Sequence, residues 1–117
     1  MNSLTKVGKI VFAIPFFMFG AFHFMNAGGM EGVVPSYVPG GVFWVYLTGV
    51  AHLLAAIAIL ANKMVRIAGI LLGVMLILMG LMVHLPAFID GNQMEMANLM
   101  KNIALAGGAF IIAGLSD

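Results

Sequence analysis

Apolar residues in this chain form four long runs, separated by short stretches that are polar or rich in proline and glycine. The runs cover about residues 4–25, 41–60, 65–85 and 97–115. The hydrocarbon core of a bilayer is about 30 Å thick, and a helix needs roughly 20 apolar residues to cross it. The pattern therefore predicts an all-α integral membrane protein with four spans.

The connections between the runs predict how the spans are arranged. ANKMVR (61–66) and PAFIDGNQMEM (86–96) are short, which favours antiparallel neighbours. The first connection contains Pro35 and Pro39, which lack a backbone N–H and bias the preceding residue toward extended geometry. We expect a single domain over 1–117, an antiparallel up-down four-helix bundle with a Pro/Gly-rich non-helical loop folded across one mouth.

Composition strengthens the membrane assignment and excludes several functions. Hydrophobic residues make up 63% of the chain and charged residues 8%, whereas a soluble domain carries about 25% charged residues. The net charge is only +1 and the basic residues form no patch, so we expect no nucleic-acid partner. The chain has no cysteine, which excludes disulfides, thiolate metal sites and iron–sulfur clusters within it.

The basic residues predict the orientation of the spans. Four of the five lie at the start of the chain or in the turn after the second run: Lys6, Lys9, Lys63 and Arg66. Under the positive-inside rule these positions are cytoplasmic, so both termini are expected in the cytoplasm and the proline loop outside. We interpret the basic start and its apolar run as a retained signal anchor that forms the first span.

Each predicted helix carries polar side chains on the same face as small residues. In a membrane, small residues let helix backbones approach, and a polar group that faces lipid is costly. We therefore expect these faces to turn inward. They are Phe16, Gly20 and His23 in the first run; Thr48, His52 and Ala56 in the second; Gly69, Gly73, Gly80 and His84 in the third; and Asn98, Asn102 and Ala106 in the fourth.

The helical rise of about 1.5 Å per residue places most of these polar groups in the outer half of the bundle. His23 and His84 end their spans on the outer side, and His52 lies roughly 16 Å below the start of its span, near mid-membrane. An interfacial tyrosine lies in the proline loop. The candidate ligand-binding residues are therefore His23, His52, His84, Asn98, Asn102 and Tyr37.

The same residues also have purely structural interpretations. His23 and His84 could cap the ends of their spans near water. A hydrogen bond between helices, or to a backbone carbonyl, could satisfy His52, and the two asparagines could hold neighbouring helices together. The proline loop could be a rigid connector.

Three segments occur in a characteristic order: FGAFHF (19–24), VVPSYVPGG (33–41) and VYLTGVAHLLAAIAIL (45–60), followed by a basic turn and RIAGILLGVMLILMG. In this order and spacing the chain resembles the DoxX family of small four-span bacterial membrane proteins over nearly its whole length. The resemblance implies a multi-pass four-helix bundle in the bacterial cytoplasmic (inner) membrane. Family members often have a glutamate where this chain has His52. An imidazole titrates nearer neutral pH than a carboxyl group does.

The resemblance also implies a link to membrane redox assemblies, since the family takes its name from an association with thiosulfate:quinone oxidoreductase. Two functions then fit equally well. In the first, an outer-half pocket binds a lipophilic molecule such as a quinone, with hydrogen bonds donated by His23, His52, His84 and Asn102. In the second, the chain is a non-catalytic assembly subunit whose polar residues only fix helix packing. It stays open whether the chain catalyses a reaction. It also stays open whether a redox protein or a second copy of the chain binds it in the bilayer.

A metal- or haem-binding function is a third, less favoured alternative. Three imidazoles suit zinc or copper. The three histidines come from different spans, however, and the estimated depth separates His52 from the other two by roughly 16 Å along the membrane normal. We therefore predict no metal site.

Overall fold

A computed structural model describes residues 2–116 of the protein, which form helices and no strands. Four helical segments in this range are long and apolar enough to cross a membrane: Ser3–Met25, Val42–Ala61, Val65–Ile89 and Met94–Gly114. By length and composition they indicate a multi-pass membrane protein. The all-α class is confirmed, and each of the four predicted apolar runs forms a helix long enough to cross a membrane.

The third span is longer than predicted because it continues through a proline. It consists of α4 (Val65–Met79), a π-helical turn (Gly80–His84) and α5 (Leu85–Ile89). The sequence placed its end near residue 85, since Pro86 has no N–H and its ring crowds the carbonyl four residues earlier. In the structure the N–H of Leu85 bonds the carbonyl of Gly80, five residues back. This wider turn lets the helix continue past the proline.

The fourth span, α6 (Met94–Gly114), begins three residues before the predicted start at 97. Asn92 Oδ1 accepts the backbone N–H of Met94 at 3.2 Å. Glu95 lies in the first turn, where the helix dipole favours a negative charge. Both residues were assigned to the connection, but Glu95 lies in the helix and Asn92 lies directly before its N-cap residue, Gln93.

The connection after α1 (Ser3–Met25) is helical in its first half. It contains α2 (Ala27–Met30) and a 3₁₀ turn, η1 (Glu31–Val33), where the sequence predicted a non-helical loop. No proline interrupts this part, so backbone hydrogen bonds such as Met30 N–H to Asn26 O can form. Residues 34–41, which include both prolines, are not helical.

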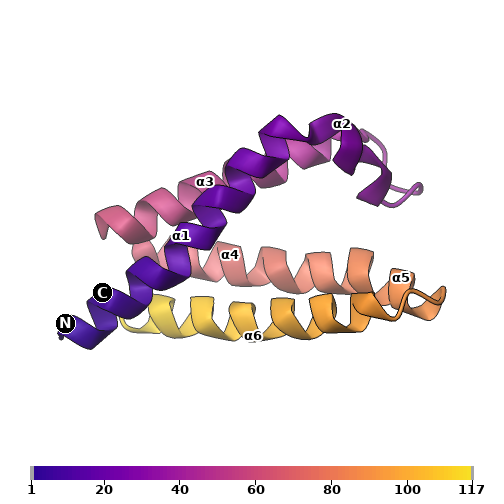
Figure 1. The fold of residues 1–117 in the computed structure, drawn as a ribbon. Coiled ribbons are helices and arrows are strands. Elements are labelled where there is room, and N and C mark those ends of the chain that lie inside the picture. The colour runs from indigo at the N-terminus through magenta and orange to yellow at the C-terminus, as the bar shows by residue number, and fades with distance from the viewer. Residues whose placement is uncertain (1, 117) are drawn as a thin grey trace.

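The spans pack as two close pairs, α1 with α3 (Val42–Ala61) and α4 with α6 (Figure 1). Glycines permit the close approach. A Cβ added at Gly20 would lie 2.9 Å from the carbonyl oxygen of Gly49, and one at Gly69 would lie 2.7 Å from the carbonyl oxygen of Ala109. The small residues predicted to face inward therefore form the contacts within each pair.

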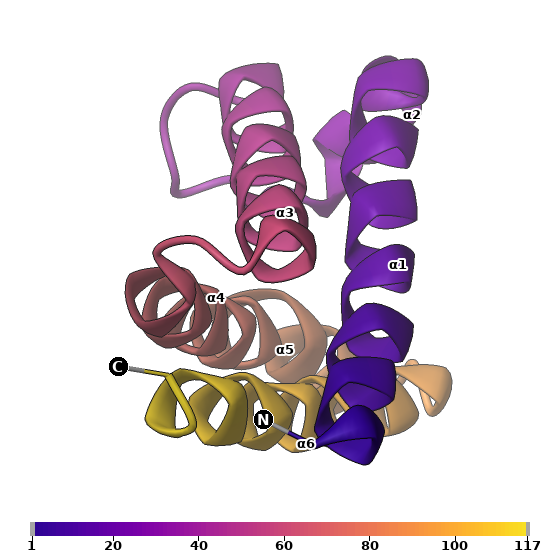
Figure 2. The ribbon, with the colours of Figure 1, turned by 90° about the vertical axis from the view of Figure 1, so that its left-hand side faces the viewer.

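The two pairs meet at one end of the molecule and diverge toward the other (Figure 1). We call the end with the start of α1 and the end of α6 the terminal end, and the end with α2 the loop end. Figure 2 looks from the terminal end, with α4 and α6 nearly along the line of sight, α3 above them, and α1 rising from the level of α6 along one side. A buried cluster joins the pairs, and it includes Phe16, Ala56, Leu76 and Ala106.

Three of the predicted inward-facing polar residues are fully buried. His23 is 7% exposed, His52 3% and Asn102 4%. Large apolar side chains cover the outer surfaces of all four spans, as expected where a protein faces acyl chains.

Candidate functional site

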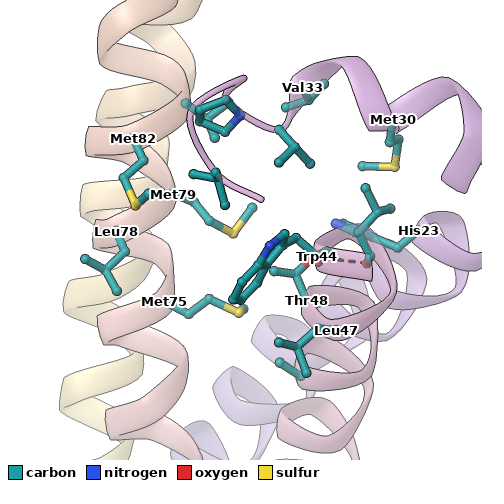
Figure 3. A pocket seen from close by; sticks show the side chains of 16 residues that line it. His23, Met30, Val33, Trp44, Leu47, Thr48, Met75, Leu78, Met79 and Met82 are labelled. Carbon is teal, nitrogen blue, oxygen red and sulfur yellow. Dashed lines mark hydrogen bonds between the residues drawn. The ribbon is translucent and has the colours of Figure 1, made fainter. Parts of the chain in front are cut away.

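A cavity of about 530 Å³ lies at the loop end, where the two helix pairs diverge. Its walls come from the first half of α3, the second half of α4 with the π-helical turn after it, the end of α1 and the connection after α1 (Figure 3). Small-molecule sites in proteins commonly have volumes of about 300–1,000 Å³. The cavity is therefore large enough for a ligand of moderate size.

The walls are almost entirely apolar. The connection contributes Met30, Val33, Val34, Pro35 and Val38. Met75, Leu78 and Met79 from α4 and Met82 from the π-helical turn form the facing wall (Figure 3). Flexible thioether side chains adapt to irregular ligand shapes.

Sequence reasoning did not single out these methionines and so missed this wall. The signal was present, because Met75, Met79 and Met82 recur at four and three residues on one helical face. The same spacing is ordinary for a packed or lipid-facing helix, however, so spacing alone could not identify a cavity.

Three side chains with polar groups line the cavity, and each donates within the protein. Trp44 Nε1 donates to the carbonyl of Pro39 at 2.5 Å. The Thr48 hydroxyl donates to the carbonyl of Trp44 at 2.8 Å. His23 Nδ1 lies 2.6 Å from the carbonyl of Phe19 in its own helix. The polar groups are thus held in place by backbone acceptors.

His52 lies directly behind His23, with ring centroids 4.9 Å apart. Its Nδ1 bonds the carbonyl of Thr48 at 2.7 Å. The predicted separation of roughly 16 Å between these histidines was wrong. A Cβ added at Gly49 would lie 2.8 Å from the Cβ of His23, so His23 packs level with the second turn of α3 and close to His52. Counting residues from each span end missed this register.

The two imidazoles belong to a column of four rings. Phe12 and Phe16 have centroids 4.8 Å apart, Phe16 and His52 5.8 Å, and His52 and His23 4.9 Å. The column runs from the core between the pairs to the cavity wall. Ring contacts of this kind fix the planes of both imidazoles.

His84 belongs to a different cluster, between the third span and α6. Its Nδ1 lies 2.5 Å from Glu95 Oε2, and Asn98 Nδ2 donates to Glu95 Oε1 at 3.2 Å. Neither His84 nor Asn98 lines the cavity. Sequence reasoning did not select Glu95, although an acidic residue in the first turn of a span is itself unusual.

The remaining two candidates also lie apart from the cavity. Asn102 Nδ2 donates to the backbone carbonyl of Leu76 at 3.3 Å and so joins α6 to α4. Tyr37 is 71% exposed and is not part of the cavity wall. Of the six candidates, only His23 lines the cavity, and His52 stacks against it.

The hydrogen bonds change the chemistry expected of the site. We expected His23, His52, His84 and Asn102 to donate hydrogen bonds to a ligand. In the structure, Nδ1 of each histidine and the amide of Asn102 are engaged with protein acceptors. Within residues 2–116, no group of three His, Cys, Asp or Glu side chains lies close enough together to hold a metal ion.

A family model described as a domain of unknown function (DUF8561) matches residues 12–108. The chain belongs to this family. The match extends from the middle of α1 into α6 and so includes every residue that lines the cavity. No curated protein and no solved structure matches the chain significantly.

Proposed function

We propose that the protein binds a lipophilic small molecule in the loop-end cavity. The observation that carries the proposal is the apolar space of about 530 Å³ between α3 and α4, with one imidazole in its wall. Ligand sites typically combine apolar walls with a few polar groups. Leu47, Leu78 and Met82 line the cavity and are each more than one third exposed, so the cavity is open at these residues. A molecule dissolved in the bilayer can therefore enter from the side.

We place the protein in a bacterial inner membrane as an antiparallel up-down bundle with both termini in the cytoplasm. The support is the positive-inside rule. Lys6, Lys63 and Arg66 are exposed, and all three lie toward the terminal end, near the start of α1 or the turn between α3 and α4. In this orientation the cavity lies in the outer half of the membrane.

The resemblance to the DoxX family supports a place in a membrane redox assembly, with a quinone-like molecule as the ligand. The chain has no cysteine, so any electrons would move through the ligand and a partner protein. The protein also contacts the lipid bilayer. Its partner in the assembly is either a membrane redox protein or a second copy of the chain.

Extraction of the purified protein with organic solvent, followed by mass spectrometry, tests the proposal. We expect a lipophilic molecule in stoichiometric amount, enriched over its content in the membrane. Ala51→Phe fills part of the cavity, since Ala51 lines it, and should remove this molecule. Ala104→Phe adds the same ring on an exposed face of α6 and should retain it. Extracts that contain only bulk phospholipid would contradict the proposal.

An assembly subunit without a ligand is the second candidate function. It is favoured by the hydrogen bonds that use polar groups for packing, such as Asn102 to the Leu76 carbonyl and His84 to Glu95. Affinity purification from native membranes distinguishes the two functions. An assembly subunit should retain its partner when Ala51→Phe fills the cavity. A metal- or haem-binding role predicts metal in elemental analysis or a haem absorption band.

A further inference from the structure

The hydrogen bond made by His23 determines which of its ring nitrogens carries the proton. Nδ1 lies 2.6 Å from the backbone carbonyl of Phe19, and a carbonyl oxygen can only accept. Nδ1 must therefore carry the hydrogen. In a neutral imidazole this leaves Nε2 with a lone pair and no hydrogen, so Nε2 can only accept a hydrogen bond.

Nε2 of His23 makes no hydrogen bond within residues 2–116, the described part of the chain, although only 7% of the residue is exposed. In the same range, the only fully buried side-chain nitrogen or oxygen without a partner is Nζ of Lys9. Nε2 of His23 is therefore not fully enclosed by protein atoms, and His23 itself lines the cavity.

The other two polar groups on the wall offer a ligand no hydrogen either. Trp44 has one N–H, which the Pro39 carbonyl accepts, and an indole has no acceptor. Thr48 has one O–H, which is directed to the carbonyls of Trp44 and Val45, while its oxygen keeps free lone pairs. With a neutral His23, the three polar side chains of the wall thus present hydrogen-bond acceptors to a ligand and no free donor.

We propose that the ligand carries a hydroxyl group that donates a hydrogen bond to Nε2 of His23, with its apolar part against the methionine wall. The proposal rests on the function proposed above and specifies its ligand as a lipophilic alcohol or a quinol. A quinone presents carbonyl oxygens, which only accept. A carbonyl placed against Nε2 would leave two acceptors unsatisfied in an apolar site, which is unfavourable.

The single tryptophan of the chain provides a direct measurement. Trp44 is the only tryptophan and lines the cavity, so its fluorescence reports on occupancy. Titration compares an isoprenoid alcohol with its methyl ether, which has the same tail and lacks the donor. We expect the alcohol to bind about fivefold more tightly, the difference that one net hydrogen bond of about 1 kcal/mol produces.

Two variants test the role of His23. His23→Phe keeps a ring in the column and removes Nε2, so the affinity for the alcohol should fall to that for the ether, while the affinity for the ether stays the same. His84→Phe is the matched control, because that imidazole lies outside the cavity, and it should change neither affinity. If His23→Phe does not fold, the comparison of alcohol and ether on the unmodified protein decides the question alone.

A second ligand pair identifies the source of the hydroxyl. An isoprenoid quinol and the matching quinone are titrated without oxygen, and the quinol should bind more tightly. Tighter binding of the quinol than of the alcohol would identify a quinol as the ligand, and the reverse order an alcohol. Equal affinities within both pairs, or preference for the ether and the quinone, would overturn the hydroxyl proposal and leave the cavity function intact. Failure of all four compounds to bind would overturn both.

Discussion

At the scale of single residues, His52 shows how an imidazole is accommodated deep in an apolar bundle. Its Nδ1 bonds the Thr48 carbonyl one turn earlier in the same helix, and its ring packs between Phe16 and His23. The contacts within its own helix satisfy one nitrogen, and the ring column supplies the packing. We therefore expect the packing of the ring to contribute more to stability than this hydrogen bond.

Substitution of His52 tests this role. His52→Ala should lower the free energy of unfolding by about 2–4 kcal/mol, because it removes a buried ring and leaves a cavity. His52→Phe keeps the ring column and should cost clearly less. Denaturant unfolding in detergent micelles measures both changes. Equal losses in the two variants would show that the hydrogen bond, and not the packing, dominates.

Lys9 is the least expected residue of the buried face. The sequence placed it with the basic rim, but it is 5% exposed and its Nζ has no partner in the described part of the chain. A buried charge without a partner is unfavourable. We therefore predict that Lys9→Met stabilises the protein by about 1–3 kcal/mol. Lys6→Met, at an exposed position of the same helix, should change unfolding very little.

At the scale of elements, glycines determine how closely the helices of each pair approach. Gly69 of α4 faces the backbone of α6, where an added Cβ would lie 2.7 Å from the Ala109 carbonyl oxygen. Backbone cannot move aside as easily as a flexible side chain. The α4–α6 distance therefore depends on this glycine.

Gly69→Ala should accordingly destabilise the protein by about 1–3 kcal/mol through overpacking. Gly107→Ala is the matched control in the partner helix, because an added Cβ there meets nothing within 4 Å. The control should be neutral or gain about 0.5–1 kcal/mol from the higher helix propensity of alanine. A neutral Gly69→Ala in the same unfolding assay would show that the helices can separate at little cost.

At the scale of the whole molecule, the divergence of the two helix pairs creates the cavity. The pairs share a packed cluster with Phe16 and Leu76 near their meeting point, and the space between them opens toward the loop end (Figure 1). An apolar cavity of this size loses contacts that a bound molecule would restore. Ligand binding should therefore be linked to stability.

An isoprenoid alcohol at 100 times its dissociation constant should stabilise the protein by about 2.7 kcal/mol, if it binds only the folded state. The shift is measured as an increase in Tm. Ala51→Phe should abolish the increase, and Ala104→Phe should preserve it. An equal increase in all three proteins would indicate a general detergent effect and no specific site.

The sequence by itself determined the number of spans and the faces that turn inward. Four apolar runs of sufficient length predict four crossings. Unpaired backbone groups are costly in hydrocarbon, and a helix pairs them all within one segment. The four-residue spacing of polar and small residues predicted the burial of His23, His52 and Asn102, which the structure shows. Both results depend only on local geometry and on the cost of polar groups in lipid.

Only the tertiary structure decided which of these residues meet. Helical periodicity gives the face of a residue, but neither the register between two helices nor the angle at which two pairs cross. Contact between Gly49 and His23 set the register that brings His23 to His52. His84, which meets Glu95, is the last residue of the π-helical turn before Pro86. The cavity exists because the pairs diverge, which depends on packing between residues distant in the chain.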